Sequence, residues 1–158
     1  MNSIVLKDIT YRYPLTDFDA LHNVSFQFEA GKFYGIIGPN GAGKTTLCSL
    51  VKGLIPSFFQ GDLSGEVSIL GKPMADWDES ELTSRVGYIF QNPFTQISGV
   101  KDTVFEEIAI GLENLCMPKD EIIERVVNIV QLIGIEDLIE LNPNELSGGQ
   151  RQRVAFAS

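Results

Sequence analysis

The sequence is poor in several residue types that mark whole classes of protein. It contains two cysteines, Cys48 and Cys116, which are too few for a disulfide framework and lack zinc-ligand spacing. We therefore expect both to be reduced thiols in the core. No apolar run reaches the roughly 18 residues that span a bilayer. The first residues show no basic stretch followed by an apolar region, so the sequence predicts a cytoplasmic protein without a signal peptide.

Positive charge is also scarce. Lys and Arg number 12 against 21 Asp and Glu, so the formal net charge is -9 at pH 7. This balance argues against a nucleic-acid partner, because phosphates attract basic surfaces. Apolar residues make up 44% of the chain and charged residues 21%, as in ordinary folded proteins. A length of 158 residues suits one domain or a piece of a larger one.

Hydrophobic periodicity predicts an α/β arrangement in the first half of the chain. Two stretches of alternating apolar and polar residues favour an antiparallel layer, and an apolar run before Gly38 favours a strand buried on both faces. Helical spacing of leucine and valine predicts a helix over residues 47–54. The predicted strands cover residues 9–13, 24–28, 33–37, 67–70 at an edge, and 85–90.

The second half of the chain predicts helices. Thr103 and Glu106 form a capping box ahead of one helix, and Asp120 is expected to cap another, which ends at Gly134. No internal repeat or low-complexity linker is present. We interpret residues 94–144 as a helical insertion.

A glycine-rich loop carries the strongest chemical signal. It fits the pattern G-x-x-x-x-G-K-[ST] between a predicted strand and a predicted helix, which is the context that a phosphate-binding loop requires. Glycines let backbone N–H groups converge on phosphate oxygens, and the helix adds the positive end of its dipole. We expect Lys44 to contact the β and γ phosphates, Thr45 to bind Mg²⁺, and the Thr46 N–H to lie near the α phosphate. The motif consists of Gly38, Pro39, Asn40, Gly41, Ala42, Gly43, Lys44 and Thr45.

A second predicted anion site begins another helix near the end of the chain. The segment Leu-Ser-Gly-Gly-Gln places Ser147 as N-cap, and Gly148 and Gly149 allow close approach to the backbone. Gln150 completes the segment, and two arginines follow it. Without the glycine-rich loop elsewhere in the chain, we would interpret this segment as the capped start of a surface helix whose arginines are solvated.

Together the two motifs resemble those of an ABC (ATP-binding cassette) transporter ATPase, and the resemblance runs from residue 1 to 158. It implies a P-loop NTPase core with an antiparallel β layer and an α-helical insertion, incomplete at the C-terminus. Residues 1–93 would form the β layer and P-loop core, 94–144 the insertion, and 145–158 the signature motif with its helix. In this family two copies face head to tail, so the residues of the signature would meet the γ phosphate of the partner's ATP. Those residues are Ser147, Gly148, Gly149 and Gln150.

Two further residues match the family pattern. Tyr13, in Tyr-Arg-Tyr-Pro, corresponds to the aromatic residue that stacks on adenine, with Tyr11 as its nearest rival. Gln91 follows the predicted strand at 85–90, where the family has the glutamine that senses Mg²⁺ and the attacking water. In the family, this glutamine also links the ATPase to its membrane partner. By resemblance, Lys44 and Gln91 are therefore the catalytic residues of this segment, and Thr45 and Gln91 are the Mg²⁺ ligands.

Two other segments narrow the resemblance to the energy-coupling-factor group, which drives uptake of vitamins and of cobalt or nickel ions. They are Phe-Gln-Asn-Pro-Phe-Thr-Gln at 90–96 and Ile-Gly-Leu-Glu-Asn-Leu at 110–115, and a long connection at 56–65 agrees with them. The expected function is an ATP-hydrolysing subunit on the inner face of the cell membrane. Its partners would be a second ATPase copy and a transmembrane subunit.

The chain stops eleven residues after Ser147. The family places a Mg²⁺-binding aspartate, a water-polarising glutamate and a γ-phosphate-contacting histidine beyond that point. Asp137 precedes the signature and is expected at a helix exit, and His22 is expected on the surface or in a loop. We therefore interpret the 158 residues as a fragment, the start of a longer chain or half of a tandem pair. The alternatives are a nucleotide-binding module without turnover and a soluble ABC ATPase that acts on DNA or ribosomes.

Overall fold

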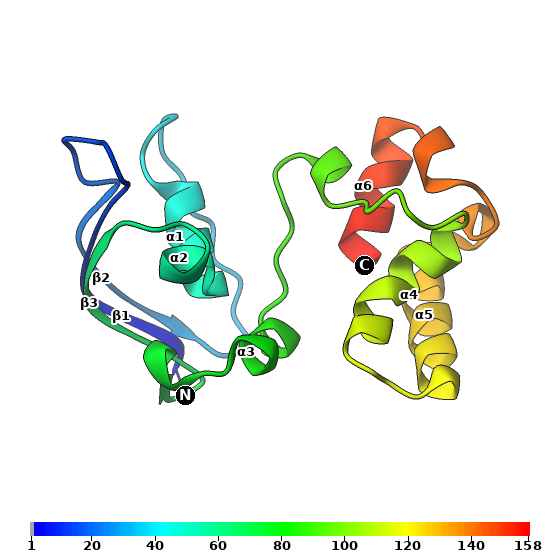
Figure 1. The fold of residues 1–158 in the computed structure, drawn as a ribbon, viewed down its shortest axis with the longest axis horizontal. Coiled ribbons are helices and arrows are strands. Elements are labelled where there is room, and N and C mark those ends of the chain that lie inside the picture. The colour runs from blue at the N-terminus through cyan, green and yellow to red at the C-terminus, as the bar shows by residue number, and fades with distance from the viewer. Residues whose placement is uncertain (1) are drawn as a thin grey trace. The chain divides into compact units, whose positions relative to one another are not determined.

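The computed structural model describes residues 2–158, except for the side chains of Asn2 and Pro93. The chain divides into two compact units, one ending at Gly87 and the other spanning Tyr88–Ser158. Each unit is described by itself below. Figure 1 shows strands and short helices in the first unit and helices alone in the second.

The first unit contains a four-stranded antiparallel sheet. Its strands are β1 (Asn2–Arg12), β2 (Leu21–Glu29), β3 (Asp62–Ile69) and β4 (Lys72–Pro73), in the order β2-β1-β3-β4. Val5 of β1 faces Gln27 of β2 on one side and Ser68 of β3 on the other. The strands predicted at 9–13 and 24–28 are confirmed. The strand predicted at 67–70 exists but is not at the edge, because β4 pairs with its outer side.

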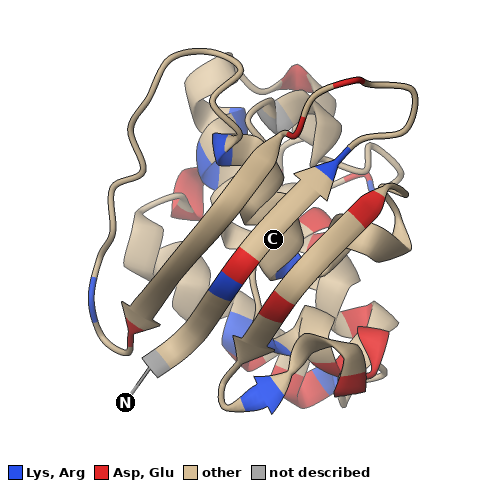
Figure 2. Cartoon of the chain, turned by 90° about the vertical axis from the view of Figure 1, so that its left-hand side faces the viewer, with Lys and Arg blue, Asp and Glu red and all other residues tan. Residues whose placement is uncertain are grey.

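Three helices pack on one face of this sheet. They are α1 (Lys44–Lys52), α2 (Leu54–Ser57) and α3 (Glu79–Arg85), of which α1 confirms the helix predicted after the glycine-rich loop. Figure 2 looks onto the opposite face, where charged residues are scattered along the strands and Lys7 pairs with Glu66 across β1 and β3. The core between sheet and helices consists of Leu6, Ile9, Tyr11, Leu21, Val67, Ile69, Leu50, Ile55 and Leu82.

Two predicted strands are not present, and this is the main correction to the sequence analysis. Residues 33–37 and 86–90 have no regular secondary structure, and Arg85 is the last residue of α3. Phe33 and Ile37, expected to be buried, are fully exposed. A strand buried on both faces needs neighbours on both edges to satisfy its backbone groups. Among residues 2–158 no strand pairs with either segment.

The second unit is a helical cluster. Its helices are α4 (Val104–Asn114), α5 (Lys119–Ile133) and α6 (Gly148–Ala157), with single 3-10 turns at η2 (Pro93–Thr95), η3 (Glu136–Leu138) and η4 (Pro143–Glu145). The helices bury an apolar face against one another, as their periodicity predicts. The buried residues are Val104, Ile108, Ala109, Ile122, Val126, Val130, Ile135, Leu138, Leu146 and Val154.

The helix ends agree with the sequence in most places. Thr103 caps α4 by accepting a hydrogen bond from the Glu106 N–H, which is one half of the predicted capping box. The reciprocal bond from the Thr103 N–H to the Glu106 side chain is not formed within residues 2–158. Gly134 ends α5 in the left-handed conformation with φ 65°. The prediction that Asp120 caps α5 is wrong. Pro118 is the N-cap and provides no side-chain hydrogen bond, while Asp120 lies in the first turn. An acidic side chain in the first turn still stabilises the helix, because it lies near the positive end of the helix dipole.

The two cysteines are free, but neither lies in the core. Cys48 is exposed because α1 turns Thr46, Ser49 and Leu50 toward the interior, and Cys116 is exposed after the end of α4.

Two other expectations are confirmed. His22 is at the surface, at the start of β2, and Asp137 lies in η3 after the exit of α5. No helix in residues 2–158 is both long enough and apolar enough to cross a membrane.

Gly65 shows how tightly β1 and β3 approach each other. Its φ is +98°, and a Cβ placed on it would lie 2.6 Å from the carbonyl oxygens of Lys7 and Asp8. The register of β1 against β3 shifts at this point, between Lys7 and Thr10, and Asp8 has a positive φ of 53°. Residue 65 therefore has to be glycine for the irregularity to form.

We expect Gly65→Ala to destabilise the protein more than Gly71→Ala. Gly71 also has a positive φ, +81°, but a Cβ there meets nothing within 4 Å. The left-handed backbone costs an alanine about 1–2 kcal/mol at either position. The backbone clash at residue 65 adds about 1–3 kcal/mol. Free energies of unfolding in urea test this, and equal losses in the two variants would contradict it.

Candidate functional site

The glycine-rich loop has a left-handed backbone, which favours glycine, at two points. Gly41 has φ +82° and Gly43 has φ +80°. A Cβ on Gly43 would lie 2.3 Å from the carbonyl oxygen of Ala20, just before β2. Gly43 is also the N-cap of α1, so this close approach places the beginning of α1 against the beginning of β2.

The loop concentrates positive charge. The Lys44 ammonium donates hydrogen bonds to the carbonyl oxygens of Gly38, at 2.9 Å, and Pro39, at 2.8 Å, so it lies across the loop. The first turn of α1 contains no acidic residue that would offset the positive end of its dipole. Free N–H groups, a helix N-terminus and one ammonium make this loop suited to a phosphate group.

The two threonines at the start of α1 differ in exposure. The Thr45 side chain is exposed, so its hydroxyl is free to bind a ligand from solvent. Thr46 is buried at 6% exposure, and its Oγ1 lies 3.2 Å from the Tyr13 hydroxyl. Tyr13 is therefore bound directly to the helix that follows the glycine-rich loop.

The structure separates Tyr13 from Tyr11, the two candidates for a base-stacking aromatic residue. Tyr11 is completely buried, and its hydroxyl donates to the carbonyl oxygens of Phe59 and Gln60 at 3.2 and 2.9 Å. Burial, assisted by the neighbouring Tyr13, raises the pKa of Tyr11. Tyr13 is half-buried and meets the Tyr11 ring edge to face at 4.9 Å. Tyr11 is thus a core residue, and Tyr13 is the aromatic side chain beside the loop.

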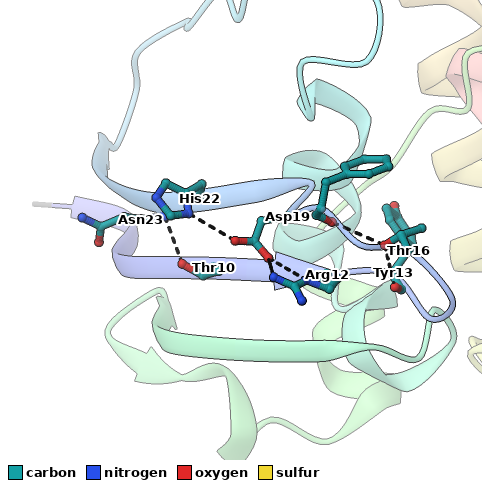
Figure 3. Close-up of polar contacts among 8 residues, drawn as sticks. Thr10, Arg12, Tyr13, Thr16, Asp19, His22 and Asn23 are labelled. Carbon is teal, nitrogen blue, oxygen red and sulfur yellow. Dashed lines mark hydrogen bonds and ion pairs between the residues drawn. The ribbon is translucent and has the colours of Figure 1, made fainter.

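Polar contacts brace the connection between β1 and β2 that follows Tyr13 (Figure 3). Arg12 donates to one oxygen of Asp19 at 2.8 Å, and His22 Nδ1 lies 3.2 Å from the other. The hydrogen bond from Arg12, with a second from His22, holds the pKa of Asp19 below its usual range. Thr16 donates to the Tyr13 carbonyl oxygen at 2.8 Å. These contacts fix the backbone from which Tyr13 projects.

The predicted signature forms the capped start of α6. Ser147 Oγ accepts from the Gln150 N–H, and Gln150 Oε1 accepts from the Ser147 N–H at 2.9 Å, which completes a capping box. Gly148 and Gly149 are exposed, and a Cβ on either would meet nothing within 4 Å. The first turn of α6 contains no acidic residue. It is therefore a second accessible helix N-terminus with a positive potential.

Gln91 lies exposed in the loop between Phe90 and η2. Sequence reasoning missed the neighbouring Gln96, whose side-chain amide closes this loop, and the stacking of Arg151 on Phe94. The contacts of Gln96 with Ala155 and of Arg151 with Phe94 have no sequence signature, because each joins residues that are remote in the sequence. The contact of Gln96 with Phe90 is local.

The predicted residues thus fall into two groups. The first unit brings Tyr13 together with the glycine-rich loop, Lys44, Thr45 and Thr46. The second unit holds Gln91 and the signature.

The residues of the loop fit a nucleotide with Mg²⁺. Its glycines leave the phosphate-facing backbone uncovered, and Lys44 supplies a cation. In residues 2–158 no group of three or more His, Cys, Asp or Glu residues is placed to hold a metal ion. Within the first unit, the Thr45 hydroxyl together with phosphate oxygens would hold Mg²⁺, an ion that proteins usually bind with few side chains alongside substrate phosphates.

Comparison with known proteins identifies the family of this chain. Residues 21–158 match the ABC transporter family. A putative ABC transporter ATP-binding protein of Pyrococcus horikoshii is 39% identical over all 158 residues, which cover 55% of that protein. One of Treponema denticola is 39% identical over 155 residues, which cover 98% of this chain and 31% of that protein. The chain thus spans about half or less of the length of these relatives.

Solved structures agree in fold. The cbiO1 protein of Clostridium perfringens, part of the ABC transporter complex cbiONQ, superposes with a TM-score of 0.81 at 30% identity, covering 99% of this chain and 60% of that one. The ATP-binding cassette MJ0796, a dimer bound to ADP and Pi in a post-hydrolysis state, superposes with a TM-score of 0.80 at 30% identity, covering 98% and 67%. The fold is therefore that of an ABC ATPase cassette over this segment. With its glycine-rich loop and its signature both inside the matched region, the chain belongs to the ABC transporter family.

Proposed function

We propose that this chain is the ATP-binding part of a subunit that powers an ABC importer of the energy-coupling-factor type. The observation that carries the proposal is the glycine-rich loop, with Gly43 packed on Ala20 and Lys44 lying across the loop. The segments at 90–96 and 110–115 support the energy-coupling-factor assignment. The likeness to cbiO1, itself part of a transporter complex, supports it as well.

Within this proposal the first unit binds the nucleotide. Lys44 neutralises charge on the β and γ phosphates, and the backbone N–H of Thr46 contacts the α phosphate. Tyr13 stacks on adenine, held in place by its hydroxyl contact with Thr46. By resemblance to the family, Thr45 and Gln91 would be ligands of Mg²⁺, and the ion would supply further positive charge at the phosphates. Catalysis by these residues consists of positioning and charge neutralisation.

The second unit would act on the nucleotide of another copy. Ser147, Gly148, Gly149 and Gln150 present the N-terminus of α6, and in a head-to-tail dimer this surface would meet the partner's γ phosphate. The dimeric form of MJ0796 supports such an arrangement. Binding of two ATP molecules would close the dimer, and hydrolysis would release it.

The subunit would lie on the inner face of the membrane against a transmembrane partner. The acidic composition of the chain supports a protein partner over nucleic acid. Turnover would also require the aspartate, glutamate and histidine that the family places after the signature helix. A second candidate function, supported by the glycine-rich loop and Lys44, is ATP binding without turnover.

We expect Lys44→Ala to lower the affinity of the full-length protein for ATP·Mg²⁺ by about 10- to 100-fold. The substitution removes a charge-assisted hydrogen bond of about 1.5–3 kcal/mol to the phosphates. Isothermal titration calorimetry measures the effect. Lys32→Ala is the matched control, because Lys32 is exposed and pairs only with Glu29. Unchanged affinity in Lys44→Ala would contradict the proposal.

We expect Gly149→Asp to abolish ATP-dependent dimerisation and hydrolysis while leaving ATP binding to the isolated subunit unchanged. The new carboxylate would face a γ phosphate across the dimer, but it would stabilise α6 by about 0.3–1 kcal/mol because it lies at the helix N-terminus. Loss of dimerisation therefore could not come from unfolding. Light scattering with and without ATP measures the dimer, and Gln152→Asp is the control within the same helix. A dimer of normal affinity in Gly149→Asp would show that the signature does not face the nucleotide.

A further inference from the structure

One side chain closes the loop that carries Gln91. Gln96 Oε1 accepts a hydrogen bond from the Phe90 N–H at 3.0 Å. Its Nε2 donates to the Ala155 carbonyl oxygen of α6 at 2.9 Å and lies 3.5 Å from the Tyr88 carbonyl oxygen. The same amide thus joins the two ends of the loop and attaches them to α6.

A second contact binds the loop to the same helix. The Arg151 guanidinium lies 4.1 Å from the centre of the Phe94 ring, a cation–π contact. Arg151 also donates to the carbonyl oxygen of Asn144 at 2.8 Å, just before the signature. Arg151 and Ala155 are four residues apart, so they lie on one face of α6. The loop therefore packs along that face at two points.

The far end of the loop segment is also fixed. The Ser98 N–H and hydroxyl both donate to the Glu107 carboxylate, which is 1% exposed within α4. Gln91 itself is exposed, and within the described part of the chain no hydrogen bond holds its side chain. Residues that follow Gln91 in the sequence thus attach the loop to α6, through Gln96, and to α4, through Ser98. The Gln91 side chain remains exposed.

These contacts link Gln91 to the signature. Ala155 and the capping residue Ser147 belong to one short helix, which moves as a rigid element. We propose that Gln96 is a positioning residue that holds Gln91 and the signature motif as one body, so that displacement of either displaces the other. This inference rests on the proposed function, in which Gln91 contacts Mg²⁺ and the membrane partner. A force applied to the loop by that partner would then reach the signature through the Gln96 amide.

The chemistry of the position explains why an amide is required. The Phe90 N–H needs an acceptor, and the Ala155 carbonyl oxygen needs a donor. Glutamate would keep the acceptor but would set a carboxylate against the Ala155 carbonyl. Methionine would keep the length of the side chain and lose both hydrogen bonds.

The test uses the full-length protein in its transporter complex and compares Gln96→Glu with the parent. We expect kcat for ATP hydrolysis to fall about tenfold. KM for ATP and the thermal unfolding midpoint should stay unchanged, because the substitution leaves Tyr13 and every residue of the glycine-rich loop intact. Gln131→Glu, the same substitution on the exposed surface of α5, is the control and should match the parent. Gln96→Met should repeat the loss of kcat without a new charge.

A double-mutant cycle with Gln91→Ala separates positioning from a general structural role. If Gln96 acts through Gln91, Gln96→Glu should lower kcat little further in the Gln91→Ala background. Additive losses would overturn the inference, as would a normal kcat in Gln96→Glu and Gln96→Met or a lowered unfolding midpoint in both. Failure of the parent itself to bind and hydrolyse ATP would instead refute the proposed function.

Discussion

The nucleotide-binding half of this chain depends on one close approach, between residue 43 and the carbonyl oxygen of Ala20. With no Cβ, Gly43 can adopt φ +80° and lie against this oxygen, which fixes where α1 begins. The direction of α1 determines where Lys44 reaches and which way Thr45 and Thr46 point. Tyr13 is placed by the same arrangement, since its hydroxyl contacts Thr46. A single steric constraint therefore positions the cation, the helix N-terminus and the aromatic side chain together.

Helices α1 and α6 both have a positive electrostatic potential at the N-terminus, but the surroundings of the two N-termini differ. Both α1 and α6 begin without acidic residues, so each presents an uncompensated positive potential. At α1 a lysine and a curved glycine loop surround that potential, which suits a group that is to be bound tightly. At α6 the first turn is exposed, with two glycines and a serine cap, and it offers the helix N-terminus without a lysine.

Local rules predicted much of this structure. The glycine-rich loop, the Thr103 and Ser147 caps and the left-handed end of α5 at Gly134 each depend on residues within a few positions of one another, and each was foreseen. The strands expected at 33–37 and 85–90 did not form, because a strand requires partners that periodicity cannot supply. The prediction that Cys48 lies in the core was wrong, because the spacing of the neighbouring leucines alone does not show which face of α1 packs against the sheet. The attachment of Gln96 to α6 was missed because Ala155 is remote in the sequence.

The exposed segment at 33–37 has a practical consequence for handling the protein. Phe33 and Ile37 are exposed on a stretch without regular secondary structure, whose backbone pairs with no strand of residues 2–158. Such a stretch is a template for pairing with an identical one in another molecule, which leads to aggregation. Recombinant preparations of residues 1–158 alone should therefore be handled dilute and cold, and their solubility is a measure of how well this stretch is shielded.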